Sequence, residues 1–69
     1  MSPEVSTRLR GAILAEAHRR APLPQELYDW LVERGWSGFD VSGALSKMWD
    51  EGDIEIGADR RIRLPEDGR

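Results

Sequence analysis

The stretch from Trp36 to Leu64, WSGFDVSGALSKMWDEGDIEIGADRRIRL, decides the fold of this chain. Apolar residues recur at helical spacing in its first half and alternate with charged residues in its second half. Ser37 is a typical helix N-cap, and Gly52 is typical of the position that follows a helix end. The stretch therefore predicts a helix over about 38–51, followed by a β-hairpin over about 53–64.

The predicted helix has a defined start and one inward face. Asp40 lies three residues after Ser37, where its carboxylate can return a hydrogen bond to the cap in a capping box. Trp36 and Val41 have the spacing of a hydrophobic staple across the helix start. The residues expected to face the core are Val41, Ala44, Leu45 and Met48. The opposite face then carries Ser42, Gly43, Ser46, Lys47 and Asp50.

The hairpin is predicted from isoleucines that alternate with charged residues. If the apolar residues share one face, Ile56 pairs with Ile62 and residues 57–61 form the loop. The same register places Glu55 opposite Arg63. This acid is then expected to neutralise part of the positive charge of the hairpin.

A first helix is predicted over about 3–20. Ser2 and Pro3 make a typical helix start, since serine can cap and proline suits the first helical position. The apolar residues at spacings of three and four form one stripe, which consists of Val5, Leu9, Ala12, Ile13 and Ala17. Four arginines lie largely off this stripe and are expected to form a solvated face more than a phosphate clamp: Arg8, Arg10, Arg19 and Arg20.

A second helix is predicted over about 24–34, because Pro24 suits a first helical position and Gly35 suits the position after the end. Leu23 lies between two prolines and is consistent with a short edge strand. The connector from Gly35 to Ser37 is very short. Such a link makes the second and third helices cross steeply, as in a helix-turn-helix.

The composition is that of one small domain, and we expect residues 1–69 to form a single unit with a loose tail over 65–69. The chain has no cysteine, which excludes a disulfide framework and thiolate metal ligands. Its single histidine, His18, has no partner for a metal site, and the carboxylates form no recognisable acid–base pair. We therefore expect no metal, no cofactor and no catalysis. Because the sequence has neither a long apolar run nor a signal peptide, a soluble cytoplasmic protein is expected.

The charge is unevenly distributed along the chain. Ten basic residues stand against thirteen acidic residues, which gives a formal net charge of −3. Residues 37–64 contain four basic and six acidic side chains, a balance of −2. Proteins that neutralise phosphates usually carry a basic excess, so this balance counts against nucleic-acid binding.

Three segments, LPQELYDWLVERG, SGFDVSGALSKMWDEGDIEI and ADRRIRL, together resemble a winged helix-turn-helix domain over nearly the whole chain. Such domains typically contain Leu-x-x-Leu-x-x-x-Gly followed by an isoleucine strand. The segment from Leu45 to Gly52, followed by Ile54, is similar in spacing. The resemblance implies an α+β fold with three helices followed by a two-stranded β-hairpin wing.

The resemblance also implies a function, because many winged helices bind duplex DNA with the third helix in the major groove and the wing on the backbone or minor groove. The implied protein is a sequence-reading DNA-binding protein of the transcription-regulator type, acting as a dimer. By position, the DNA-binding residues are Ser37, Phe39, Ser42, Gly43, Ser46 and Lys47 on the helix and Arg60 and Arg61 on the wing. The helix offers small residues for close approach but no Asn, Gln or Arg on its outward face for a bidentate base contact.

The acidic balance keeps a second function open, that of a winged-helix module that docks on a larger protein without binding nucleic acid. Trp49 either covers the base of the wing or anchors a partner or a second copy. Trp36 belongs either to the staple or to the same interface, and Phe39 is expected mainly to pack. Arg60 and Arg61 either contact DNA or keep the hairpin soluble.

Overall fold

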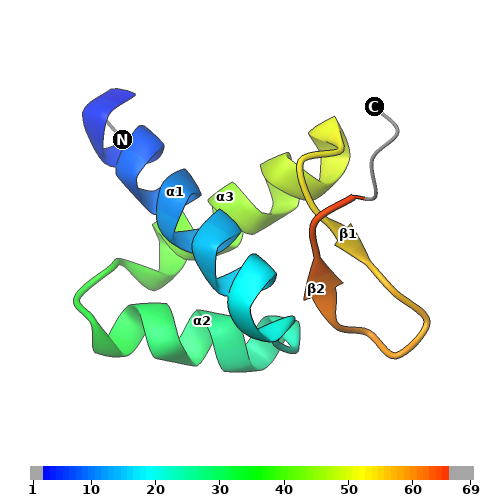
Figure 1. Ribbon diagram of the computed structural model, residues 1–69. Helices are drawn as coiled ribbons and strands as arrows, with labels where there is room; N and C mark the ends of the chain where they lie inside the picture. The colour runs from blue at the N-terminus through cyan, green and yellow to red at the C-terminus, as the bar shows by residue number, and fades with distance from the viewer. Residues whose placement is uncertain (1–2, 66–69) are drawn as a thin grey trace.

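The computed structural model describes residues 3–65, and the predicted Ser2 cap and residues 66–69 of the predicted tail lie outside this range. Three helices precede a two-stranded antiparallel hairpin, as the sequence predicts (Figure 1). The elements are α1 (Pro3–Arg20), α2 (Pro24–Glu33), α3 (Gly38–Glu51), β1 (Glu55–Ile56) and β2 (Ile62–Arg63). This is the α+β layout of a winged helix, and α1 and α3 have the predicted bounds.

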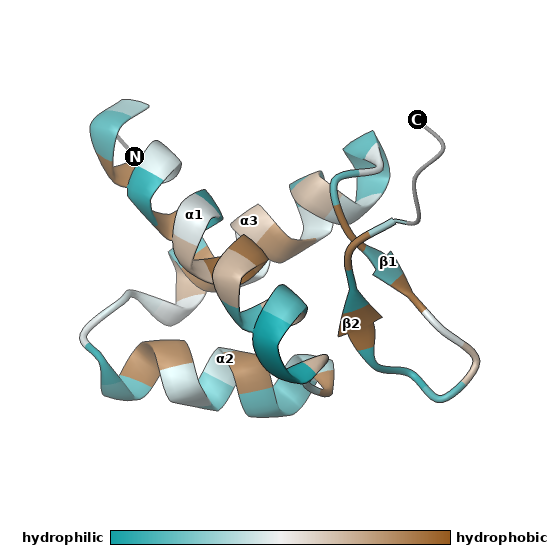
Figure 2. Ribbon diagram, in the orientation of Figure 1, coloured by the Kyte–Doolittle hydropathy of each residue, from teal (hydrophilic) through white to brown (hydrophobic). Residues whose placement is uncertain are grey.

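The hydrophobic core lies between the three helices and the base of the hairpin. Figure 2 shows apolar segments of the helices directed toward the centre of the molecule. All elements except β1 contribute a buried side chain: the core residues are Leu9, Ile13, Ala17, Leu27, Leu31, Val41, Met48, Ile54 and Ile62. The predicted helical stripes therefore face the core, although Val5 and Ala12 at the edge of the first stripe are only partly buried.

The helix α2 is closed by a side-chain hydrogen bond at its start and by backbone hydrogen bonds at its end. At its start, the Leu23 N–H donates to Glu26 Oε1 at 3.1 Å, which is the return bond of a capping box. At its end, Gly35 adopts a left-handed φ of 101°. The Trp36 N–H then donates to the Leu31 carbonyl at 3.1 Å, a pattern known as a Schellman motif. This motif reverses the chain and directs it into α3.

The helix α3 has the predicted cap residues. The Ser37 hydroxyl accepts from the Asp40 N–H at 3.4 Å, which is the forward bond of the expected capping box. The return bond from the Asp40 carboxylate is not among the hydrogen bonds of the described residues. At the other end, Gly52 has a φ of 86°, and the Asp53 N–H donates to the Met48 carbonyl at 2.8 Å. A second Schellman motif therefore ends α3 and returns the chain toward the core.

The hairpin has the predicted register, with Ile56 opposite Ile62 and residues 57–61 as the loop. Its strands are shorter than predicted, with two residues each. The expected edge strand at Leu23 is wrong, because Leu23 is the N-cap of α2. The neighbouring Pro22 carbonyl accepts the Ile62 N–H at 2.8 Å instead. This bond fixes the outer edge of β2 to the connection between α1 and α2.

The two glycines of α3 give a matched test of this packing. A Cβ at Gly38 would collide with the Tyr28 hydroxyl, whereas a Cβ at Gly43 would meet nothing within 4 Å. We expect Gly38→Ala to lower the free energy of unfolding by about 1–3 kcal/mol through overpacking. Gly43→Ala should raise it by up to about 1 kcal/mol, because alanine favours a helix interior. Urea unfolding followed by tryptophan fluorescence measures both; equal responses would contradict the predicted collision.

Candidate functional site

The outward face of α3 exposes two large aromatic side chains. Phe39 is 88% exposed and Trp49 is 58% exposed. Val41 and Met48 are buried on the opposite side of the same helix, so the core contacts of α3 fix which face is turned outward. The mainly packed position that we expected for Phe39 is therefore wrong.

Small residues separate the two aromatic side chains along this face. Ser42, Gly43 and Ser46 are exposed, and they follow Phe39 at the spacing of one helical face. We call the set Phe39, Ser42, Gly43, Ser46, Trp49 and Asp50 the α3 surface. The side chains in its middle are small and those at its two ends are large, which leaves room for another backbone to approach the middle.

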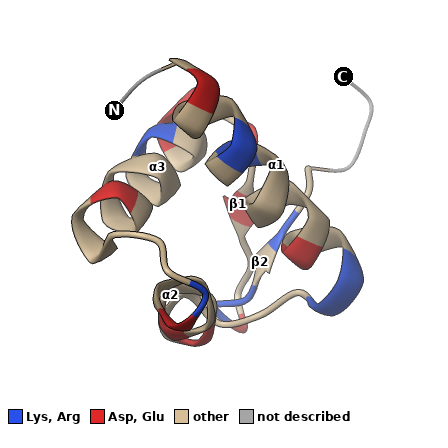
Figure 3. Cartoon of the chain, turned by 90° about the vertical axis from the view of Figure 1, so that its left-hand side faces the viewer, with Lys and Arg blue, Asp and Glu red and all other residues tan. Residues whose placement is uncertain are grey.

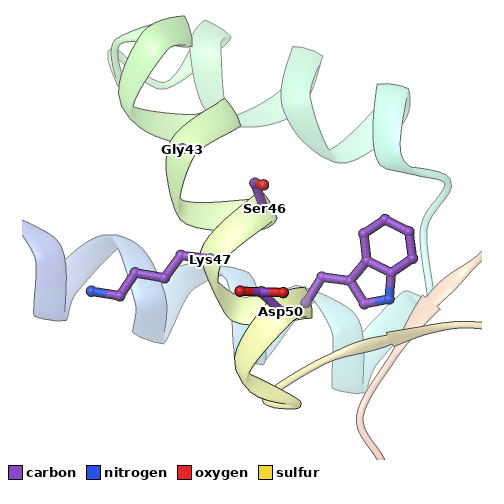
Figure 4. Close-up of a pocket in the computed structure, with 5 residues that line it drawn as sticks. Gly43, Ser46, Lys47 and Asp50 are labelled. Atoms are coloured by element: carbon purple, nitrogen blue, oxygen red, sulfur yellow. The ribbon is translucent and has the colours of Figure 1, made fainter.

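An open hollow lies on the C-terminal half of the α3 surface, lined by Gly43, Ser46, Lys47, Trp49 and Asp50. Figure 4 shows Lys47 pointing to one side of the helix, away from Ser46. Lys47 also lines a second hollow between α1 and α3, together with Arg10 and Glu51. The one lysine of α3 therefore lies on the flank that borders α1, and not at the centre of the α3 surface.

The charges around the α3 surface are mostly acidic. The helix carries Asp40, Asp50 and Glu51 but only one basic residue, Lys47. Figure 3 shows acidic positions on the α3 ribbon and on α2. An approaching phosphate backbone would meet net negative charge on this helix.

The wing holds its arginines in different environments. Asp59 pairs with Arg63 at 2.7 Å and also accepts the Arg61 N–H at 3.1 Å. Glu55 does lie opposite Arg63, as expected, but Arg63 forms its ion pair with Asp59 of the loop instead. The Arg61 side chain donates to the Ala21 carbonyl at 3.0 Å. Arg61 is thus directed toward the α1–α2 connection and not toward the α3 surface.

Arg60 is the exposed residue of the wing with an unusual backbone conformation. Its φ is 67°, in the left-handed region that residues with a Cβ seldom adopt. Its N–H donates to the Gly57 carbonyl at 2.8 Å, and the Gly57 N–H donates to the Arg61 carbonyl at 3.0 Å. Residues 58–60 thus form a three-residue turn between Gly57 and Arg61. A turn of this type usually has a glycine at the left-handed position. The arginine therefore carries a conformational cost that glycine would avoid.

Three of the arginines of α1 form ion pairs within the chain. Glu16 is only 3% exposed and binds Arg20 at 2.9 Å and Arg19 at 3.5 Å. Arg10 pairs with Asp53 at 3.0 Å, which joins α1 to the segment after α3. The four arginines are exposed, as predicted for a solvated face, but these pairs were not foreseen from the sequence. The signal was present in the sequence, because Glu16 lies three residues after Ile13 on the apolar stripe and precedes both arginines by one turn.

The other two tryptophans lie against the core. Trp36 is partly buried and packs on the core cluster, which fits its predicted place at the start of α3, while its interface role stays a prediction. Trp30 is also partly buried against the core cluster, and the Arg34 guanidinium lies 4.1 Å from its ring centre. Arg20 lies 5.9 Å from the same ring centre. Of the three tryptophans, Trp49 is thus the exposed one.

The predicted DNA-binding residues do not form one continuous surface. Phe39, Ser42, Gly43 and Ser46 lie together on α3, with Lys47 on its flank, while Arg61 contacts the α1–α2 connection. The Ser37 hydroxyl is already engaged in capping. Within residues 3–65, no group of three or more His, Asp and Glu side chains is arranged to hold a metal ion. None of the helices in this range is long and apolar enough to cross a membrane.

Comparisons with protein-family models, with curated proteins and with solved structures each returned no match to this chain.

The conformation of Arg60 gives a direct test of why an arginine occupies that position. We expect Arg60→Gly to raise the free energy of unfolding by about 1 kcal/mol, because glycine adopts positive φ without steric cost. Arg60→Ala removes the same guanidinium but keeps the cost, so it serves as the matched control and should give no comparable gain. Thermal unfolding followed by circular dichroism compares the two variants. An equal gain in both would mean that the charge, and not the backbone, is responsible.

The carboxylate of Asp59 makes the stability of the wing dependent on pH. The hydrogen bond from the Arg61 N–H, followed by the nearby Arg63 charge, holds the pKa of Asp59 below its ordinary value of 3.8. Because this pKa is lowered in the folded chain, its stabilising effect is complete above pH 3.8 and is lost as the pH falls through the folded pKa. We expect a carboxyl-carbon NMR titration to give a midpoint for Asp59 below 3.8. In Arg63→Gln the midpoint should rise, and an unchanged midpoint would contradict the role of the ion pair.

Proposed function

We propose that this chain is a winged-helix module that binds a protein partner through the α3 surface. The observation that carries the proposal is the exposure of Phe39 and Trp49 on one helix, at 88% and 58%. Both side chains would bury large apolar area on contact, and tryptophan in particular is enriched among the residues that dominate binding energy. The fold leaves these rings in water, so the free chain gains little from them.

The spacing of the two rings suits a helical or extended partner. Ten residues separate Phe39 from Trp49, which corresponds to about 15 Å along the helix. The residues between them, Ser42, Gly43 and Ser46, do not project far from the helix. A partner segment can therefore lie along α3 with an aromatic contact at each end.

The charges favour protein over duplex DNA as the partner. Lys47 is the one basic residue of α3, against Asp40, Asp50 and Glu51. Affinity for DNA depends strongly on phosphate neutralisation by Lys and Arg. Asp50 belongs to the α3 surface itself, where it would repel the backbone of a bound duplex.

Duplex DNA binding remains the second candidate, because the wing carries Arg60 in a left-handed conformation. Backbone strain of this kind is concentrated at functional sites. In this alternative the third helix enters the major groove through Ser42, Gly43, Ser46 and Lys47, and Arg60 contacts a phosphate. The chain would then be a DNA-binding regulator of the winged-helix type, with Arg60 more important for affinity than for stability.

A site-specific crosslinker tests the proposed protein contact. We expect a photoreactive phenylalanine at Ser46, on the α3 surface, to crosslink to protein in cells that express the chain. The same residue at Ala15, an exposed position on α1, is the control and should give no matching adduct. The combined change Phe39→Ser and Trp49→Ser should remove the adduct while the circular dichroism spectrum stays that of the wild type.

A DNA titration separates the two candidates. We expect no binding of a mixed-sequence duplex at low salt, where phosphate contacts are strongest. The opposite outcome would be binding whose log–log salt slope shrinks by about one unit in Arg60→Ala or Lys47→Ala. That result, together with crosslinks to DNA and none to protein from position 46, would overturn the proposed function.

A further inference from the structure

We infer that the partner of the α3 surface is a second copy of this chain, with the two α3 helices packed antiparallel about a twofold axis. The inference rests on the proposed function, because it names the occupant of the same surface. A twofold interface requires one surface to be complementary to itself, so that residue i contacts residue j and residue j contacts residue i. The α3 surface meets this requirement in shape and in charge.

The shape requirement is met by the symmetric order of large and small residues. In an antiparallel pair centred at position 44, residue numbers that face each other add up to 88. Phe39 then faces Trp49 of the second copy, and Trp49 faces Phe39. Ser42 faces Ser46 in the same way, with Gly43 next to the crossing point. Bulky ends thus meet bulky ends, and the helices approach most closely where their side chains are smallest.

Gly43, next to the crossing point, has open space around its Cβ position. A Cβ placed on Gly43 would have no neighbour within 4 Å, so nothing within the molecule explains a glycine at this helix position. Glycine in a helix interior costs about 1 kcal/mol relative to alanine. A second helix lying across Gly43 would make use of the missing side chain.

The charge requirement is met on one flank of α3. Asp40 and Lys47 are seven residues apart, which places them nearly one above the other on the same side of the helix. An antiparallel twofold arrangement brings equivalent flanks together. Lys47 then lies within one residue of the level of Asp40 in the second copy, and the pair occurs twice. Charges of the same sign at positions 40 and 47 would oppose the dimer.

The area available is near the lower limit for a specific interface. Allowing for their exposure, the two aromatic side chains contribute roughly 300 Å². The small and charged residues between and beside them bring the total to roughly 500–600 Å² for each copy, or about 1,100 Å² for the pair. The net charge of −3 on each chain opposes association. We therefore expect a reversible dimer with a Kd on the order of 10–100 µM.

Sedimentation equilibrium of the full chain from 5 to 500 µM at 150 mM salt tests the dimer. We expect a concentration-dependent rise from the monomer mass of 7.8 kDa to twice that value. Gly43→Gln should raise the dimer Kd at least tenfold, because a long side chain blocks the crossing point. Gly11→Gln is the matched control, since Gly11 is also an exposed helical glycine with nothing within 4 Å of its Cβ position. It should leave the Kd unchanged.

Charge reversal tests the arrangement of the two helices. Lys47→Asp and Asp40→Lys should each weaken the dimer about tenfold, and the two changes together should restore it to within about threefold of the wild type. Circular dichroism confirms that each variant is folded. Additive weakening in the double variant would overturn the antiparallel register.

The inference can fail while the proposed function survives. A chain that stays monomeric at 500 µM overturns the inference. A dimer whose Kd is unchanged by Gly43→Gln overturns it as well. In either case, crosslinks from position 46 to a different protein would still support the proposed protein contact. Binding of duplex DNA by a monomer, without protein crosslinks, would overturn both.

Discussion

Two left-handed glycines set the direction of α3, and the rest of the molecule depends on that direction. Gly35, with a φ of 101°, ends α2, and Gly52, with a φ of 86°, ends α3. A residue with a Cβ would pay about 1–2 kcal/mol for either conformation. Each glycine is followed by a residue whose N–H closes the helix end: Trp36 donates to Leu31 and Asp53 donates to Met48. These two closures set the path of the chain into and out of α3.

This orientation couples burial on one side of α3 to exposure on the other. Val41 is fully buried and Met48 is 4% exposed. Phe39 lies two residues before Val41, a rotation of about 200° around the helix axis, so burial of Val41 turns Phe39 into solvent. Bringing Phe39 into the core would require α3 to rotate and expose Val41. The exposure of the Phe39 ring is therefore a consequence of how the core is packed, and a local adjustment cannot remove it.

The sequence predicts the parts of the fold that depend on local chemistry. Ser37 and Gly52 define α3 because capping and left-handed conformations are strongly residue-specific. The register of Ile56 and Ile62 follows from the two-residue period of a strand. Sequence reasoning missed the Trp36 closure, which depends on the path of the chain after Gly35.

The candidate site was harder to predict, because it depends on which partners long side chains select. Arg63 can reach either Glu55 across the hairpin or Asp59 within the loop, and the tight turn at Arg60 brings Asp59 closer. The packing of α1 buries Glu16 beneath two arginines, which was not foreseen from the sequence. Periodicity places a residue on a face but does not say how much of that face a neighbouring element covers.

Most of the arginines in the described part of this winged-helix shape already have partners within the chain. Four arginines of residues 3–65 form ion pairs within the chain, namely Arg10, Arg19, Arg20 and Arg63. The Arg61 side chain is bound to the Ala21 carbonyl, and the Arg34 guanidinium lies over Trp30. The Arg10 ion pair and the Arg61 hydrogen bond join separate segments, whereas the other ion pairs lie within α1 or within the wing and the Arg34 contact lies at the end of α2. All of them occupy side chains that could otherwise contact phosphate.

The surface that remains for recognition is therefore governed by shape and apolar area more than by charge. The exposed ion pairs of Arg10 and Arg63 contribute little to stability, so these two arginines could be released for a strongly anionic ligand at modest cost. Arg19 and Arg20 instead neutralise the buried Glu16. The acidic groups of α3 have no such freedom, because Asp40 and Asp50 are fixed to the helix whose orientation the core determines. A ligand that approaches this helix meets two aromatic rings with small side chains between them, and a negative flank with a single lysine. In the proposed dimer, a second copy would present the same pattern to this surface in reverse order.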